Sequence, residues 1–392
     1  MMERDVKRHR IFSIGLEYYF LFIITLILSI IGIVMISSAS IPVGERYFND
    51  SYWFIRRQVI WWIISFPCFL IASRIDYKKY RRFSNFFILI VLGMLALVLI
   101  PGFSVESGGA KRWLDLWFFS PQPSEFAKLA LVFFFSDHLG RRYIKDPGIK
   151  SILWPSFFVL CLVTILIFLE PDLSTVIVIW LIIFIIMFVG EVRFKHMISL
   201  GFIGALVTTG YMFLEDYRRE RILAFFNGSS ESGGFNFQIN QSLIALGSGN
   251  ILGLGLGNSV QKYSYLPEAQ TDFIFAIIGE ELGLIGTLLI VVLFLLFAIF
   301  GIRVCLKTND YYGRVLAAGL TSLIVVPAII NIAVVIGLIP VTGLTLPFIS
   351  FGGSSLLLSM VSVGILLNIS RQNLLVRRIK KDINRRVSDE RE

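Results

Sequence analysis

Hydrophobic residues dominate the chain and lie in long runs that contain few charges. A helix needs about 20 predominantly apolar residues to cross a hydrocarbon core of about 30 Å. Runs of this kind predict ten transmembrane helices, near residues 16–38, 55–73, 84–102, 122–137, 151–169, 173–190, 197–214, 272–302, 315–339 and 354–370. We therefore expect an all-α, polytopic membrane protein with about ten transmembrane helices.

The polar segments between these runs predict the orientation, because short cytoplasmic loops retain lysine and arginine. With the amino terminus inside, the inward segments hold 26 of the 36 Lys and Arg residues. Both termini are then cytoplasmic. The expected organisation is a basic cytoplasmic tail over 1–15, a transmembrane domain over 16–370 with a large extracytoplasmic loop over 216–271, and a basic cytoplasmic tail over 371–392.

Composition adds little chemistry to this picture. The net charge of +9 follows from the orientation bias and from attraction to anionic membrane lipids, so it is not taken as a sign of nucleic-acid binding. Cys68, Cys161 and Cys305 are far apart and lack ligand spacing, so neither a disulfide framework nor a zinc site is expected.

Carboxylates gather in one stretch, from Tyr265 to Leu284, at the mouth of the eighth predicted span. Charge near a membrane is expensive and marks a functional site. Asp272 is expected at the helix start, and Glu280 lies about two turns further on, so the two should share a face. Asp272 is a candidate general base, and a helix cap is the alternative role.

Several cations face outward, against the general bias: Lys111, Arg112, Arg218, Arg219, Arg221 and Lys262. Such groups suit diphosphate oxygens, and they also suit lipid head-group anchoring. Glu125 and Lys128 form an i,i+3 pair at the start of a predicted helix. This pair is either a structural ion pair or part of a site for an anionic head group.

Two glycine-rich segments have the composition of ligand loops. The glycines from Gly247 to Gly257 miss the dinucleotide and phosphate-loop spacings, so they are expected to permit tight turns and close backbone approach. The segment from Gly352 to Ser355 is expected to turn tightly or re-enter the membrane, where its hydroxyls and amides can contact a substrate.

The chain resembles the SEDS family (shape, elongation, division and sporulation), the membrane glycosyltransferases represented by FtsW, RodA and SpoVE. The resemblance spans roughly 16–372 and rests on the motifs Gly109–Trp113, Gln122–Glu125, Pro171–Thr175, Gln238–Gly257, Tyr265–Gly283 and Gly343–Ser355. Two of these motifs look more like the division and sporulation branch. Gln270, Phe351 and Ser174 depart from the family pattern, where histidine, tyrosine and glycine are frequent.

The resemblance implies a peptidoglycan glycosyltransferase that polymerises lipid II on the outer face of the bacterial cytoplasmic (inner) membrane, for septal synthesis in cell division. It implies Asp272 as the catalytic residue. The candidate substrate-binding residues are Lys111, Arg112, Gln122, Glu125, Lys128, Arg221, Gln238, Gln241, Lys262, Glu268, Ser354 and Ser355.

The resemblance also implies partners, namely a class B penicillin-binding protein and other division proteins. No cofactor is firmly indicated. A divalent cation, Mg or Mn, stays open, with Asp272 and either Glu268 or Glu280 as oxygen ligands. Two other classes of function remain as alternatives: a lipid II flippase or transporter, and a scaffold without catalysis.

Overall fold

The computed structural model describes residues 15–107, 110–115, 119–143, 149–213, 235–263 and 265–389. Ten of its helices correspond to the ten predicted spans. They are α2 (Leu16–Ala39), α4 (Trp53–Arg74), α5 (Tyr77–Val98), α6 (Pro123–His138), α7 (Ile149–Leu169), α8 (Leu173–Val189), α9 (Phe194–Phe213), α12 (Ile274–Lys307), α13 (Tyr311–Val335) and α14 (Gly353–Asp389).

Six of these helices are long and apolar enough to cross a membrane: α2, α4, α5, α12, α13 and α14 over its first 22 residues. Within the described ranges, α8 and the Pro155–Leu169 part of α7 are apolar but shorter. The expectation of an all-α, multi-pass membrane protein is confirmed.

The remaining elements were not predicted from hydropathy. These are α3 (Ile41–Phe48), α11 (Phe235–Ser248), a π-helical turn η1 (Leu139–Tyr143), and the antiparallel hairpin of β1 (Ser104–Ser107) and β2 (Ala110–Leu114). They are short, so they leave no long apolar run in the sequence.

Two predicted helix starts were too late by four residues or more. α5 begins at Tyr77 rather than 84, because Asp76 caps it by accepting from the Lys78 amide at 3.0 Å. α13 begins at Tyr311 rather than 315, because Asp310 caps it through the Gly313 amide at 3.0 Å. A capping aspartate thus starts each helix within a polar stretch that hydropathy treats as loop.

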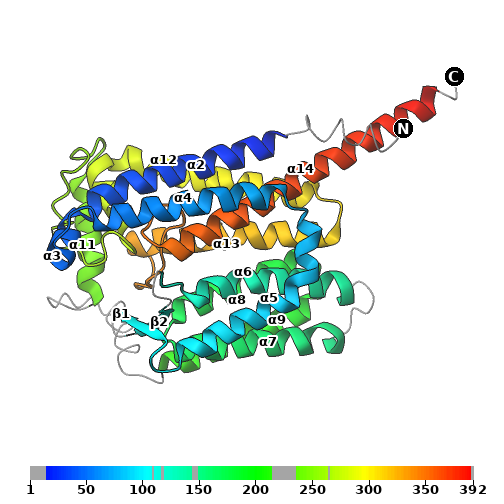
Figure 1. Ribbon diagram of the computed structural model, residues 1–392, viewed down its shortest axis with the longest axis horizontal. Coiled ribbons are helices and arrows are strands. Elements are labelled where there is room, and N and C mark those ends of the chain that lie inside the picture. The colour runs from blue at the N-terminus through cyan, green and yellow to red at the C-terminus, as the bar shows by residue number, and fades with distance from the viewer. Residues whose placement is uncertain are drawn as a thin grey trace.

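The helices form two groups (Figure 1). In the figure, α2, α4, α12, α13 and α14 lie above, and α5 to α9 lie below. α13 packs against α6 and α8 and so joins the two groups. The hairpin, α3 and α11 lie together at one end of the molecule, and α14 projects from the other (Figure 1).

Both described chain ends lie at the end from which α14 projects. Glu17 in the first turn of α2 forms an ion pair with Lys307 at the end of α12. A Cβ on Gly15 would stand 2.3 Å from the Leu374 side chain of α14. This arrangement agrees with the predicted placement of both termini on one side of the membrane.

The same end is closed by buried polar contacts. Asp137 of α6 accepts from Arg81 Nε at 2.8 Å and from Arg141 Nε at 2.5 Å. Asn368 of α14 donates to the Ser73 carbonyl at 2.9 Å and accepts from the Tyr77 amide at 3.0 Å. These contacts tie α4, α5, α6 and α14 together at the predicted cytoplasmic end.

α12 is broken at Gly283, which has φ 67° and ψ −161°. Residues 249–255 lie against the break. Leu254 and Gly255 donate their amides to the Glu280 and Glu281 carbonyls at 2.9 and 3.0 Å, and Leu284 donates to the Asn250 carbonyl at 2.9 Å. The backbone groups freed by the break therefore find partners in this segment.

Candidate active site

Asp272 lies in the turn that precedes α12, at the end of the molecule that carries the hairpin and α11. The N-cap of α12 is Phe273, the residue after Asp272, and the helix-cap alternative for Asp272 stays a prediction. Its side chain is half-buried. Its Oδ2 atom lies 3.5 Å from the point where a Cβ on Gly343 would stand.

The backbone around Asp272 is held by two other segments. Asn331 of α13 donates Nδ2 to the Asp272 carbonyl at 2.7 Å and to the Leu344 carbonyl at 2.6 Å. Ser350 Oγ donates to the Thr271 carbonyl at 2.5 Å, and the Phe351 amide donates to the Gln270 carbonyl at 3.0 Å. These contacts fix the position of Asp272 through its main chain.

Glu280 and Asp272 do not lie on one shared helix face, contrary to the expectation from their spacing. Glu280 is 1% exposed and accepts from the Ser259 hydroxyl and from the Val260 amide, the latter at 3.0 Å. The expectation assumed one helix from 272 onward, whereas α12 begins after Asp272 and turns Glu280 toward the 259–261 segment.

Lys262 is 2% exposed and belongs to the same buried cluster. Its Nζ atom donates to Glu281 Oε1 at 2.9 Å, to Ser38 Oγ at 3.0 Å and to the Gly257 carbonyl at 2.6 Å. All three ammonium donors are therefore used inside the protein. A substrate contact by Lys262 stays a prediction, and it requires the release of one of these bonds.

The starts of α6 and α8 meet near Asp272. Asp172 caps α8 through the Thr175 amide at 3.2 Å, and it also accepts from Gln122 Nε2 at 3.4 Å. Ser174 in the first turn of α8 donates to the Thr342 carbonyl. Since Thr342 precedes Gly343, this contact joins the cap of α8 to the loop beside Asp272.

The start of α14 belongs to the same network. The Gln122 amide donates to Ser354 Oγ at 3.2 Å, and Ser355 Oγ lies 3.4 Å from Thr345 Oγ1. Three predicted substrate-binding residues, Gln122, Ser354 and Ser355, thus line one polar network around the loop that touches Asp272.

Glu125 and Lys128 lie one turn further along α6 and form an ion pair at 2.6 Å. Both side chains are buried, at 9% and 5% exposure of the residue. Removing one partner of an ion pair buried in this way strongly destabilises the fold, because the other charge is left buried without a partner. The geometry fits the structural alternative, and the head-group alternative stays a prediction.

Arg112 on β2 binds main chain. Its guanidinium donates to the Glu170 carbonyl at 3.1 Å and to the Pro171 carbonyl, so it holds the turn between α7 and α8. Lys111 beside it is exposed. The hairpin therefore brings one cation into the turn next to the Asp172 cap and leaves the other in solvent.

Glu170 is a buried acid that the sequence motifs did not single out. This residue is 1% exposed, and neither of its carboxyl oxygens has a hydrogen-bond partner among the described residues. Burial, together with the Asp172 carboxylate, raises the pKa of Glu170 to about 8, although Arg112 opposes the shift. Sequence reasoning could have found Glu170, because it directly precedes the motif that begins at Pro171 and an acid at the end of a membrane span needs a partner.

The other predicted residues lie around this centre. Gln238 and Gln241 are half-buried on α11, which Ser242 fastens to α13 by donating to the Val335 carbonyl at 2.6 Å. Glu268 is exposed and accepts from Thr271 Oγ1 at 2.8 Å. Arg221, like Arg218 and Arg219, lies outside the described residues.

A divalent metal finds no ligand set in the described part of the chain, where no three His, Cys, Asp or Glu residues gather suitably. Glu280, one of the suggested ligands, uses both carboxylate oxygens on the 259–261 segment. Glu280 is therefore not available as a ligand, the pair of Asp272 and Glu268 stays a prediction, and we derive no catalytic step through a metal.

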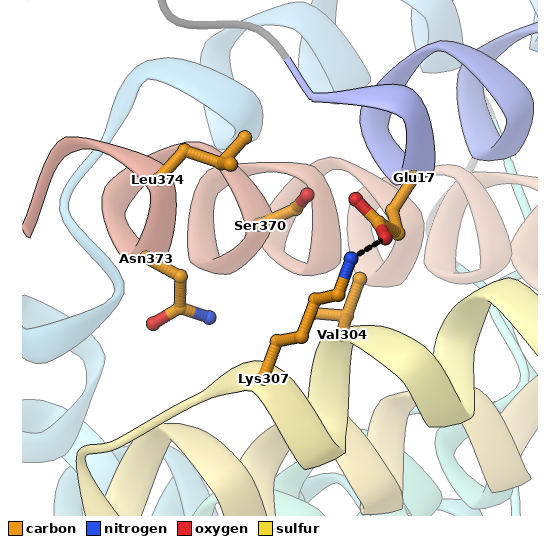
Figure 2. A pocket seen from close by; sticks show the side chains of 6 residues that line it. All are labelled: Glu17, Val304, Lys307, Ser370, Asn373 and Leu374. Carbon is orange, nitrogen blue, oxygen red and sulfur yellow. Dashed lines mark hydrogen bonds and ion pairs between the residues drawn. The ribbon is translucent and has the colours of Figure 1, made fainter. Parts of the chain in front are cut away.

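A small pocket lies beside the last turn of α12 (Figure 2). It is lined by Glu17, Val304, Lys307, Ser370, Asn373 and Leu374. Lys307 ends α12, and Asp272 precedes the start of the same helix. The Glu17–Lys307 ion pair crosses this pocket, which is unrelated to the polar network above (Figure 2).

Comparisons with known proteins agree with this geometry. The family model FTSW_RODA_SPOVE, described as "Cell cycle protein", matches residues 18–374. "Stage V sporulation protein E" of Bacillus subtilis is 42% identical over 351 residues, which cover 90% of this chain and 96% of that protein. "Probable peptidoglycan glycosyltransferase FtsW" of Geobacter sulfurreducens is 39% identical over 88% of this chain and 92% of that protein.

Solved structures show the same fold. One such chain comes from the structure "Structural coordination of polymerization and crosslinking by a peptidoglycan synthase complex". Its TM-score is 0.72 at 23% sequence identity, and the match covers 90% of this chain and 97% of that chain. The crystal structure of Thermus thermophilus rod shape determining protein RodA has a TM-score of 0.65 at 22% identity, over 90% and 96% of the two chains. The chain belongs to the FtsW, RodA and SpoVE family of cell cycle proteins.

Proposed function

We propose that this chain is a peptidoglycan glycosyltransferase that polymerises lipid II into glycan strands on the outer face of the cytoplasmic membrane. The observation that carries the proposal is the placement of Asp272: a half-buried carboxylate in a turn whose main chain is held from α13 and from the 350–351 segment. The name of the FtsW relative supports the reaction class.

Asp272 acts as the general base in this proposal. Its carboxylate takes the proton from the acceptor sugar hydroxyl, whose oxygen attacks the anomeric carbon of the donor. The bond from that carbon to the pyrophosphate oxygen breaks, and undecaprenyl pyrophosphate leaves with the electron pair. Attack opposite the leaving group inverts the anomeric centre. A positioned base of this kind contributes about 10²–10⁴-fold to a rate.

The departing pyrophosphate needs positive charge nearby. Lys111 is exposed on the hairpin and free to reach outward, whereas Arg112 fixes the turn at Glu170 and Pro171. Lys128 is neutralised by Glu125 inside the protein. We therefore assign Lys111 and the outward arginines of the 216–271 loop, such as Arg221, to the leaving group.

Partners and location follow from the same proposal. A class B penicillin-binding protein would crosslink the peptides of the new strands, and its membrane helix would pack on apolar faces of the later spans. The structurally similar chain comes from a peptidoglycan synthase complex that coordinates polymerisation and crosslinking, which supports a partner of this kind. We place the chain in the inner membrane at the division septum, with other division proteins.

A lipid II flippase is the competing function. Transport needs a path through the bundle, and here the opposite end is closed by the Asp137 and Asn368 contacts. The polar network around Asp272 is confined to the end with the hairpin and α11. These observations favour the enzyme.

The test is an Asp272→Asn variant reconstituted in vesicles with labelled lipid II. Asparagine keeps the shape and the hydrogen-bonding capacity of the side chain but cannot accept the proton. We expect the variant to fold, to insert and to bind the penicillin-binding protein, and to make no glycan polymer on a gel. Polymer at the wild-type yield would remove Asp272 from the base role. Movement of lipid II across vesicles without polymer from the wild-type chain would favour the flippase.

A further inference from the structure

Residues 249–257 form a segment without charge, here called the glycine segment, that was predicted as part of an extracytoplasmic loop. It presents large apolar side chains at its surface. Leu252 is 78% exposed and Ile251 is 64% exposed, and Leu254 and Leu256 are also exposed. Such a contiguous apolar surface on one element points to an interaction.

The glycine segment is packed against α12 by its main chain. A Cβ on Gly249 would stand 1.9 Å from the Gly279 carbonyl, and one on Gly253 would stand 2.1 Å from the Glu281 carbonyl. The expectation of close backbone approach at these glycines is met. Because the main chain faces α12, the side chains of Ile251 and Leu252 point away from the protein.

The length of α2 gives the depth of the glycine segment in the membrane. Glu17 lies at the end that holds both described chain ends, and Ser38 Oγ donates to Glu281 Oε1 at 2.6 Å. Twenty-one residues separate Glu17 from Ser38, which is about 32 Å of helix. The hydrocarbon core is about 30 Å thick. The level of Glu281, where the glycine segment lies, is therefore the outer edge of the hydrocarbon.

The surface of the segment continues the lipid-facing surface of α12. Ile285 donates its amide to the Ile251 carbonyl at 3.3 Å, and Leu284 and Ile285 are 60% and 56% exposed. Leu288 extends the same surface at 57% exposure. The apolar side chains of the segment thus adjoin a helix face that already meets acyl chains.

Several polar groups of this region have partners within the protein, which favours an apolar environment, and even the exposed Asn250 side chain donates Nδ2 to the Ser248 carbonyl at 3.2 Å. The amides of Gly253, Leu254 and Gly255 donate to the carbonyls of Gly249, Glu280 and Glu281. The ionisable neighbours are buried: Glu280, Glu281 and Lys262 are at most 2% exposed. An irregular segment in contact with lipid needs this satisfaction of its backbone, whereas a loop in water does not.

We propose that the glycine segment is seated in the outer leaflet of the bilayer, with Ile251, Leu252, Leu254 and Leu256 packed among lipid acyl chains. The occupant of this surface is bilayer lipid, because the surface is continuous with the lipid-facing side of α12 and lies at the hydrocarbon edge. The segment is then a shallow membrane-embedded element and not an extracytoplasmic loop. This inference is independent of the catalytic proposal.

The test measures the depth of a nitroxide label in the full chain reconstituted in lipid nanodiscs. Cys68, Cys161 and Cys305 are first replaced by alanine, and a single cysteine is placed at Leu252→Cys. Leu288→Cys on α12 is the lipid control, and Lys111→Cys on the exposed hairpin is the water control. Collision with dissolved oxygen reports hydrocarbon, and collision with a water-soluble nickel chelate reports solvent.

We expect the label at 252 to match the label at 288, with oxygen access well above nickel access. Nickel access equal to that of the label at 111 would overturn the proposal. Protection from both reagents would also overturn it, because it would show a protein surface, such as a second copy, over the segment. Since Leu252 is exposed, its replacement leaves the core intact, and the unfolding temperature of each variant checks this.

Discussion

Asn331 is the polar side chain that connects α13 to the turn carrying Asp272, and its removal is our most informative prediction. Asn331 is 2% exposed, and its Nδ2 atom donates to the Asp272 and Leu344 carbonyls at 2.7 and 2.6 Å. Asn331→Ala deletes both bonds at once. The two carbonyls then lose a partner in a largely buried place.

Each unsatisfied buried acceptor costs about 1–3 kcal/mol, so we expect a loss of about 2–6 kcal/mol in the free energy of unfolding. The effect on catalysis has a different origin. The lost bonds free the Asp272 main chain, and a displacement of about 1 Å can lower a rate about 10²-fold. We therefore expect kcat for glycan polymerisation to fall about 10²-fold, with KM for lipid II nearly unchanged.

Asn368 is a matched control within the same chain. It is fully buried in α14 and also makes two main-chain contacts, to the Ser73 carbonyl and the Tyr77 amide, but at the opposite end of the bundle. Asn368→Ala should destabilise the fold to a similar degree and leave kcat of the folded fraction unchanged.

The assay is polymer yield from labelled lipid II against time, at a temperature where both variants remain folded by their unfolding curves. Equal kcat values for Asn331→Ala and Asn368→Ala would refute the positioning role of Asn331. A rise in KM without loss of kcat would also contradict it, because it would show a binding defect and not a displaced base.

Three further predictions concern Gly343, the buried Lys262–Glu281 pair and Glu170. Gly343→Val introduces a side chain at φ 77° beside Asp272 Oδ2, and we expect it to cost about 1–3 kcal/mol in thermal unfolding and to lower polymer yield. Lys262→Met should cost about 3–5 kcal/mol, and adding Glu281→Leu should restore much of the unfolding temperature, because the buried carboxylate is then removed as well. The pKa of Glu170 is about 8 in the folded chain, above the ordinary value of 4.5 for a glutamate. The contribution of protonated Glu170 to stability is therefore fully present below pH 4.5 and is lost as the pH rises through 8. Glu170→Gln should flatten this pH dependence in unfolding scans from about pH 5 to pH 9.

Hydropathy predicted the ten membrane helices well because each is built from a long apolar run, and the match covers even α7 and α8. Hydropathy gave wrong helix boundaries where a helix continues through polar residues beyond its apolar run. The charged stretch after Tyr77 continues α5, and α14 runs on through a basic stretch to Asp389, beyond the predicted boundary at 370. Charged residues with good helix propensity extend a helix beyond the hydrocarbon, and hydropathy does not register them.

The site was predicted in part. The structure brings Gln122 and Ser354 together although they lie on different helices, and their contact with a substrate stays a prediction. The structural partners were missed. Asn331 is an amide side chain within a predicted span that has no charge. Sequence reasoning could have found it, because a polar amide in a membrane helix needs a hydrogen-bond partner.

The break at Gly283 could not be predicted from spacing. A single glycine in a helical pattern is usually tolerated, and the non-helical dihedral angles arise from contact with residues 249–255, some 30 positions earlier. The relation of Glu280 to Asp272 has another cause, because α12 begins only after Asp272 and the preceding turn places that residue. A pattern with the period of one continuous helix therefore gave the wrong relation between these two acids.

The length of α12 explains why the proposed chemistry takes place above the membrane. In the proposed placement Glu281 lies at the outer edge of the hydrocarbon through its bond to Ser38, and α12 continues outward from it for seven residues, or about 10 Å, to Ile274, two residues after Asp272. The residues from Ile274 to Gly279 are all buried by protein, which is why they are apolar although they lie outside the hydrocarbon. A lipid-linked donor keeps its chain in the bilayer and its pyrophosphate among the head groups, so its sugars stand further out. The proposed placement therefore puts Asp272 at the height of the sugars, where a base for a sugar hydroxyl must act, and above the level where a carrier would bind a lipid tail for transport.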